Sequence, residues 1–236
     1  MTRIRRWWMT AVALAIGLGF VAAWRGVLAG GPPPPVAGVV TESRVMALTV
    51  NVVWGTEYVP QLLAILRRHH VVATFMLGGA WAQAHPDLVR ALYDAGMEIG
   101  NHGWAHRHMS LLGPADVAAE ISRTQQAVAA ITGKAPRLFA PPYGEYNGTV
   151  LGEAARLGLP VVLWTLDTID WRPSSSPTQI VNRVVLRARP GAIVLLHPTD
   201  RTVEALPQIL DGLARQDYRL VTVSDLLTLG RPTPER

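Results

Sequence analysis

Between residues 45 and 223 the chain alternates short apolar runs with longer stretches whose apolar residues recur at helical spacing. The short runs are rich in β-branched residues and have the length of buried strands. Strands are expected over 45–53, 71–77, 97–100, 138–140, 161–165, 192–196 and 220–223, and helices over 58–68, 86–95, 114–132, 147–157, 177–188 and 202–216. This alternation predicts parallel βαβ units, and about seven strands favour closure towards a barrel over an open sheet.

The amino terminus has a different composition. Residues 1–30 carry Arg3, Arg5 and Arg6, an apolar run over 7–23, and no acidic residue. This layout is typical of a secretory signal peptide or of a signal anchor in the membrane. The run is at the lower length limit for a membrane span, so both interpretations stay open beside that of an ordinary buried helix. We expect an extracytoplasmic body, and a carboxyl-terminal reporter active only in the cytoplasm would contradict this.

The remaining chain divides by composition. Residues 31–43 are rich in glycine and proline and are expected to form a linker, residues 44–229 the folded domain, and residues 230–236 a short tail. The formal charge of +5 includes four arginines of residues 1–30. Without them the chain has 18 basic residues (22 − 4) and 17 acidic ones, so it is nearly neutral. Such a balance argues against a nucleic-acid partner. Because there is no cysteine, a metal site must use His, Asp, Glu or Asn.

A candidate metal site follows the strand expected over 97–100. His102 and His106 lie four residues apart on a glycine-flanked loop. Neutral imidazole is the commonest metal-binding side chain, and the glycines leave room for a ligand. The spacing also arises often by chance, so two surface or capping histidines are the alternative.

Other polar and aromatic residues follow the expected strands, at the end where such folds gather their chemistry. They are Asn51 to Gly55, Pro141 to Gly144, Asp167 to Trp171 and His197 to Thr199. Singly, His197 is also explained as a hydrogen-bonded core residue, Asp170 as a helix cap and Pro141 to Gly144 as a tight turn. Their joint occurrence at one rim favours a functional site.

These motifs together resemble the polysaccharide deacetylase domain (NodB type, carbohydrate esterase family 4), and the resemblance covers residues 44–227. It is carried by Asn101-His102-Gly103-Trp104-Ala105-His106, Phe139-Ala140-Pro141-Pro142-Tyr143-Gly144, Asp167 to Trp171 and Leu195-Leu196-His197. The resemblance implies a distorted (β/α)7-type barrel. It also implies removal of acetyl groups from N-acetylated sugars of peptidoglycan or chitin-like polymers with a divalent metal, usually zinc.

The resemblance assigns roles to these residues. His102 and His106 would hold the metal, His197 would be the general acid that protonates the leaving amine, and Asp170 would orient His197. A Lewis acid that polarises the amide carbonyl and a protonated imidazole for the leaving group are what this hydrolysis needs. The sugar-binding candidates are Pro142 in the groove wall and the aromatic residues Trp54, Trp104, Tyr143 and Trp171.

The chain departs from the family at its first motif. The motif Thr-Phe-Asp-Asp-Gly aligns without a gap on residues 49–53, so Asn51 replaces the general base and Val52 replaces the third metal ligand. The family's arginine before Pro-Pro-Tyr-Gly is Ala140, and Arg137, three residues earlier on a strand, would lie on the opposite face. These changes resemble a divergent, sporulation-associated bacterial subgroup of the family.

The sequence therefore predicts a member of this family that hydrolyses acetamido groups of cell-wall or spore-wall glycan with weakened activity. If Asn51 is a catalytic residue, it supplies a neutral amide where the family has a carboxylate base. The alternatives are a catalytically inactive glycan-binding protein of the same fold and a purely structural wall protein.

Overall fold

The computed structural model describes residues 31–234, and the predicted leader over residues 1–30 lies outside this part. Among the described residues, no helix has the length and apolar character needed to cross a membrane. The residues from Pro34 onward form one unit with its own apolar core.

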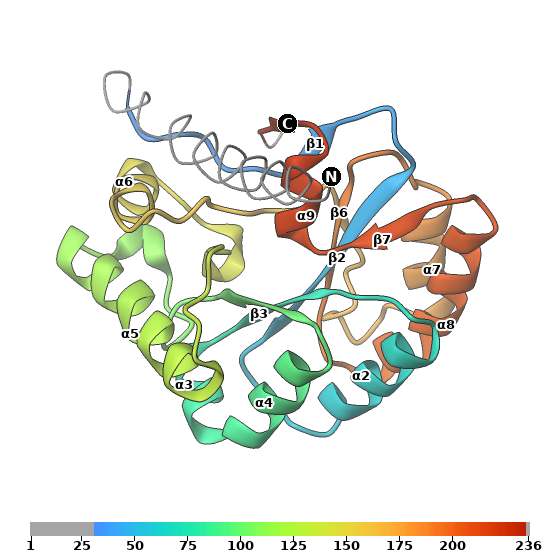
Figure 1. Cartoon of the computed structure of the whole chain (residues 1–236), viewed down its shortest axis with the longest axis horizontal. Helices are drawn as coiled ribbons and strands as arrows, with labels where there is room; N and C mark the ends of the chain where they lie inside the picture. Colours follow the sequence, from blue (N-terminus) through green and yellow to red (C-terminus); the bar gives the residue numbers. More distant parts are fainter. Residues whose placement is uncertain (1–30, 235–236) are drawn as a thin grey trace, which may run out of the picture. The chain divides into compact units, whose positions relative to one another are not determined.

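A parallel sheet is built around the longest strand, β2 (Figure 1). Its strands are β2 (Val45–Val52), β3 (Thr74–Leu77), β4 (Glu98–Asn101), β5 (Leu166–Asp167), β6 (Ile193–Leu196) and β7 (Arg219–Val221). The order is β4-β3-β2-β6-β5, and β7 pairs with the beginning of β2. Single bridges join Asn101 to Phe139 and Phe139 to Val161. Because β5 follows soon after Val161, the sheet closes towards a barrel, as predicted.

Helices follow the strands and lie around the sheet (Figure 1). They are α2 (Val59–Arg68), α3 (Gly79–Ala84), α4 (Pro86–Asp94), α5 (Pro114–Thr132), α6 (Gly148–Arg156), α7 (Pro177–Val185), α8 (Asp200–Ala214) and α9 (Val223–Thr228), with 3₁₀ turns at η2 (Met109–Leu111) and η3 (Pro142–Gly144). The six predicted helices are confirmed with ends shifted by a few residues, which is the usual uncertainty at helix termini. The short helices α3 and α9 were not predicted.

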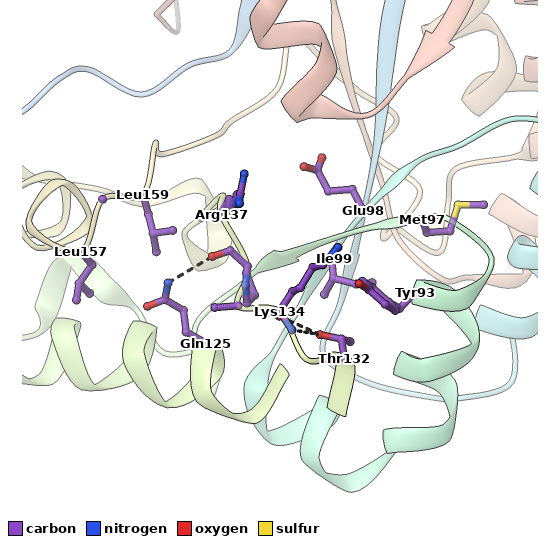
Figure 2. A pocket seen from close by; sticks show the side chains of 13 residues that line it. Tyr93, Met97, Glu98, Ile99, Gln125, Thr132, Lys134, Arg137, Leu157 and Leu159 are labelled. Atoms are coloured by element: carbon purple, nitrogen blue, oxygen red, sulfur yellow. Dashed lines mark hydrogen bonds between the residues drawn. The ribbon is translucent and has the colours of Figure 1, made fainter. Parts of the chain in front are cut away.

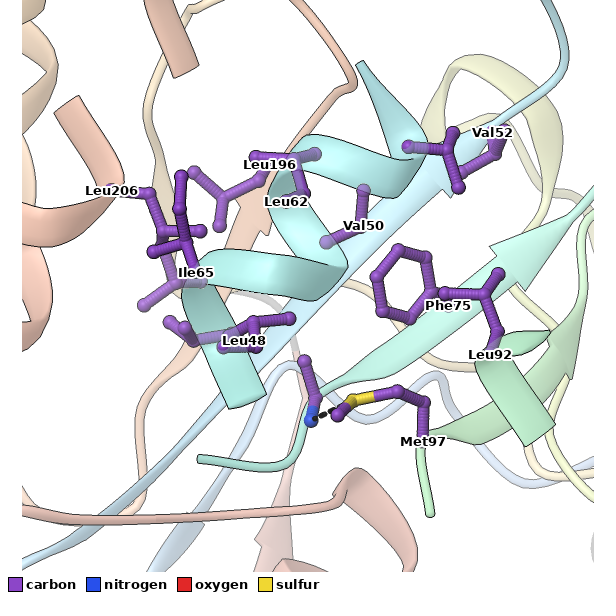
Figure 3. Packing of buried hydrophobic residues seen from close by; sticks show 14 of the residues in the cluster. Leu48, Val50, Val52, Leu62, Ile65, Phe75, Leu92, Met97, Leu196 and Leu206 are labelled. Carbon is purple, nitrogen blue, oxygen red and sulfur yellow. Dashed lines mark hydrogen bonds between the residues drawn. The ribbon is translucent and has the colours of Figure 1, made fainter. Parts of the chain in front are cut away.

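The core explains why β2 is apolar throughout. Leu48, Val50 and Val52 pack in the cluster between the sheet and the helices, against residues such as Leu62 of α2 (Figure 3). Val45 and Ala47, on the opposite face, belong to a second buried cluster. A strand buried on both faces needs side chains of this kind, each contributing about 1.5–3 kcal/mol when fully buried.

Four expectations need correction. Two predicted strands are reduced to bridges: the strand over 138–140 to Phe139, and the strand over 161–165 to Val161 and Val162, after which the ladder resumes only at β5. The ladder breaks after Val162 because the chain changes its partner: the Leu163 N–H donates to the Val36 carbonyl, and the Thr165 N–H donates to the Ile193 carbonyl of β6.

The expected linker and tail are partly structured. β1 (Gly38–Val40) pairs antiparallel with β8 (Arg231–Thr233), so strands lie within residues 31–43 and 230–236. Three-residue strands are too short for their periodicity to be recognised in a sequence.

Candidate functional site

His102 follows the end of β4 and is buried. Its Nδ1 lies 2.7 Å from the Ala140 carbonyl oxygen. A carbonyl can only accept, so Nδ1 carries the proton and Nε2 keeps its lone pair. A backbone partner that fixes the tautomer in this way is typical of a metal-binding histidine.

His106 lies beside it, with the two ring centroids 5.2 Å apart. The loop between them is held by Glu120 of α5, whose Oε2 accepts the backbone N–H groups of Trp104 and Ala105 at 2.8 Å each. Sequence reasoning missed Glu120 as part of the site. The available signal was an acidic residue on the buried face of α5, which also carries Val117 and Ile121.

Both rings are kept neutral. Burial lowers the pKa of His102 to about 3, against the opposing effect of the Ala140 carbonyl. Burial also lowers the pKa of His106, and the charges of His197 and His108 act in the same direction. A neutral imidazole is the form that binds a metal, so the site suits metal binding near neutral pH.

The low pKa of His102 predicts that the fold loses stability in acid. In the unfolded chain the ring has its ordinary value of 6.5, so between pH 6.5 and pH 3 the unfolded state binds more protons. This one group should lower the free energy of unfolding by about 2 kcal/mol between pH 7 and pH 5. Denaturant unfolding with a chelator present measures the loss, and it should be correspondingly smaller in His102→Gln.

The matched control for this experiment is His70→Asn. His70 is exposed and has a positive φ, which asparagine tolerates. An identical pH dependence in the unmodified protein, the control and His102→Gln would show that His102 is not the cause.

His197, directly after β6, pairs with Asp170. Its Nδ1 lies 2.8 Å from Oδ1 of Asp170, while Oδ2 accepts the His197 backbone N–H and the Thr202 hydroxyl, both at 2.6 Å. Asp170 is fully buried, and its carboxylate requires a donor at Nδ1, so Nε2 of His197 remains for other contacts. The charge of His197 lowers the pKa of both His102 and His106. His197 therefore lies within electrostatic range of the other two imidazoles.

The structure places Asn51 and Val52 at the end of β2, and both are buried. Val52 packs in the apolar cluster (Figure 3). Among residues 31–234, no three His, Cys, Asp or Glu side chains are grouped so that they could hold a metal ion. The residues therefore fit a metal incompletely, with two imidazoles and no carboxylate beside them.

Arg137 does not replace the family's arginine. It is exposed and lines an open groove of about 690 Å³ that also includes Lys134, Ile99 and Leu159 (Figure 2). These residues precede or begin the strand positions of the barrel, whereas the histidines follow them. The groove therefore lies at the opposite end from the site, and Ala140 itself has no cationic side chain.

Aromatic side chains surround the histidines. Trp54 is 44% exposed and stacks on His197, with 5.7 Å between ring centroids. Tyr143 is 53% exposed, has φ 60°, lies with its ring centroid 4.4 Å from that of His106, and stacks on His108 at 4.2 Å. Trp171 is 47% exposed, and the Arg172 guanidinium lies 4.8 Å from its ring centroid. Exposed aromatic rings at a rim are suited to stacking against flat faces of a ligand.

Two other sugar-binding candidates are less open. Pro142 is buried against Gly103. Trp104 is half-buried, and the Arg123 guanidinium lies 4.0 Å from its ring centroid. The Trp104 ring also lies so close to Gly79 of α3 that a Cβ there would overlap it. Trp104 is therefore engaged mainly within the protein.

Comparison with known proteins gives a consistent result. Residues 38–162 match the family model described as polysaccharide deacetylase. The chain is 35% identical over 195 residues to the uncharacterized protein YlxY of Bacillus subtilis (strain 168), covering 83% of this chain and 61% of that protein. It is 34% identical over 194 residues to the peptidoglycan-N-acetylglucosamine deacetylase PgdA of Listeria monocytogenes, covering 82% of this chain and 41% of PgdA. It thus spans less than two thirds of either relative.

A solved structure is similar over the same region. The crystal structure of a carbohydrate esterase family 4 pseudoenzyme from Bacillus anthracis has a TM-score of 0.81 at 36% identity, covering 84% of this chain and 70% of that one. A mutant of the same protein, described as having restored enzymatic activity, also has a TM-score of 0.81.

Proposed function

Because the chain belongs to the polysaccharide deacetylase family (carbohydrate esterase family 4), we propose that it binds N-acetylated cell-wall glycan and hydrolyses its acetamido groups slowly. One observation carries the proposal. His102 and His106 lie side by side and His197 pairs with Asp170, while Asn51 and Val52, at the end of β2, align with the family's base and third ligand.

Each retained residue has a role in this proposal. His102, through Nε2, and His106 would hold a divalent metal, for which zinc fits two imidazoles best. When bound, the metal would polarise the acetamide carbonyl. His197, oriented by Asp170, would donate its Nε2 proton to the leaving amine, since an unprotonated amine anion is a poor leaving group. The exposed rings of Trp54, Tyr143 and Trp171 would stack against the sugars.

The reaction would be slow for two reasons. Asn51 carries an amide, which cannot accept a proton from attacking water, and general-base assistance is worth about 10²–10⁴-fold in rate. Val52 supplies no oxygen, so the metal would lack the negative charge that a carboxylate provides and would bind loosely.

A second candidate is a glycan-binding protein without any catalysis. It is favoured by the likeness to the Bacillus anthracis pseudoenzyme and by the packing of Val52 in the apolar cluster. The two candidates share the binding site and differ only in acetate release, which is absent for the second.

Both candidates predict affinity for N-acetylglucosamine oligomers. Trp54→Ala and Trp171→Ala should each weaken binding roughly tenfold, because a stacked aromatic ring contributes on the order of 1 kcal/mol beyond its buried area. Isothermal titration calorimetry with a soluble oligomer measures this. Tyr93→Ala is the matched control, since Tyr93 lies at the groove at the opposite end of the barrel (Figure 2). If neither the protein nor its variants bind the oligomer, a structural role replaces both candidates.

A further inference from the structure

Ile169, immediately before Asp170, has φ 54°. This left-handed conformation is rare for residues other than glycine and is a genuine outlier for a β-branched side chain. Such backbone strain costs on the order of 1–3 kcal/mol and persists only where surrounding contacts over-determine it. The contacts around Ile169 therefore show what fixes the direction of the Asp170 side chain.

Side chains hold this turn from both sides. The Ile169 N–H donates to Oδ1 of Asp167 at 2.7 Å, and the Ile169 carbonyl accepts the Ser175 hydroxyl at 2.7 Å. The Thr168 hydroxyl donates to the Leu195 carbonyl at 2.8 Å, which ties the turn to β6. Thr168 and Ser175 are buried, so these bonds are shielded from water.

Arg183 of α7 joins two of these contacts. Its Nη1 donates to the Thr168 carbonyl at 2.7 Å and to the Ser175 hydroxyl oxygen at 3.0 Å. The Ser175 hydroxyl in turn donates to the Ile169 carbonyl. One guanidinium nitrogen therefore holds the Thr168 carbonyl directly and the Ile169 carbonyl through Ser175. Charge-assisted hydrogen bonds of this kind are stronger than neutral ones.

We propose that Arg183 is a positioning residue for the general acid: with Ser175 it holds Ile169 in the left-handed conformation that directs the Asp170 carboxylate at His197. Arg183 acts through the turn alone. The inference rests on the proposed function, in which His197 is the acid. Its test reads the His197 ring directly, so it does not depend on whether acetate is released.

The test is nitrogen NMR of the His197 ring in the ¹⁵N-labelled full chain. In the unmodified protein the neutral ring should be a single tautomer with the proton on Nδ1, held by Asp170. In Arg183→Gln both tautomers should appear, and the Nδ1–H should exchange with water roughly tenfold faster or more, because a hydrogen bond to a charged group is weakened. Arg187→Gln, an exposed arginine just after α7, is the matched control and should leave both signals unchanged.

A rescue experiment separates positioning from general stability. Glycine adopts a positive φ without strain, so Ile169→Gly in the Arg183→Gln background should restore the single tautomer. If Arg183→Gln does not fold, Ser175→Ala removes the Ser175 bonds to the Ile169 carbonyl and to Arg183, keeps the bond from Arg183 to the Thr168 carbonyl, and should give the same mixture of tautomers. Arg183→Gln or Ser175→Ala with a lower melting temperature but an unchanged His197 tautomer would overturn the proposal. If Arg183→Gln gives the expected mixture of His197 tautomers but the unmodified protein releases no acetate, the proposed hydrolysis is wrong and the positioning role of Arg183 stands.

Discussion

Replacing Asn51 and Val52 together by aspartate is expected to make the stability of this fold depend on zinc. Val52 is fully buried in the apolar cluster, and an uncompensated charge there should lower the free energy of unfolding by about 3–5 kcal/mol without metal. If the aspartate at position 52 is the missing ligand beside His102 and His106, zinc pairs this charge. Zinc at about 100 times its dissociation constant would then return about 2.7 kcal/mol.

The measurement is thermal unfolding of the double variant with a chelator and with zinc, together with a zinc titration. Zinc should bind more tightly than it does to the unmodified protein, because the site gains a negative ligand. Val50→Asp is the matched control: Val50 is buried on the same face of β2, but two residues before the strand end. It should be destabilised as strongly and not recover with zinc. Recovery in Val50→Asp, or none in the double variant, would mean that position 52 does not reach the metal.

Asp170→Asn should abolish most of the activity of the double variant. The amide can donate to Nδ1 of His197 and so favour the tautomer with the proton on Nε2 alone, which removes the doubly protonated acid form that Asp170 supports. The expected loss is about 10²–10⁴-fold in the rate of acetate release, the usual worth of general acid–base assistance. The fully buried amide would also leave contacts to His197 and Thr202 poorly matched, costing about 1–3 kcal/mol.

The matched control is Asp167→Asn. Asp167 lies three residues earlier and uses one oxygen to accept the Ile169 N–H, which an asparagine oxygen also does. This variant should keep most of the rate. A loss as large as that of Asp170→Asn would assign the effect to the loop as a whole, and an undiminished rate in Asp170→Asn would remove His197 from the reaction.

Much of the fold was predictable because apolar periodicity survives wherever an element is long. The eight residues of β2 and the nineteen of α5 were recognised on this basis. The pair β1 and β8 was not, since strands of three residues give no period. The break after Val162 could not be predicted either, because the bonds from Leu163 to Val36 and from Thr165 to Ile193 join residues far apart in the chain.

The site divides in the same way. Motif spacing identified His102, His106, Asp170 and His197. In the structure the rings of His102 and His106 are adjacent, Asp170 pairs with His197, and His197 acts electrostatically on His102. Contacts made from neighbouring helices were beyond it: Glu120 reaches the histidine loop from α5, and Arg183 reaches the acid's turn from α7. For Trp104, a sequence cannot show that the Arg123 guanidinium lies over its ring.

We propose that this chain keeps the acid and two metal ligands of its family and lacks the base and the third ligand. The most direct test is the initial rate of acetate release from an N-acetylglucosamine oligomer at saturating zinc. The unmodified protein should be about 10²–10⁴-fold slower than the variant with Asn51→Asp and Val52→Asp, to which Ala140→Arg is added to hold the new base. An unmodified protein that binds zinc tightly and releases acetate as fast as that variant would contradict the claim, and a different residue would then supply the ligand and the base.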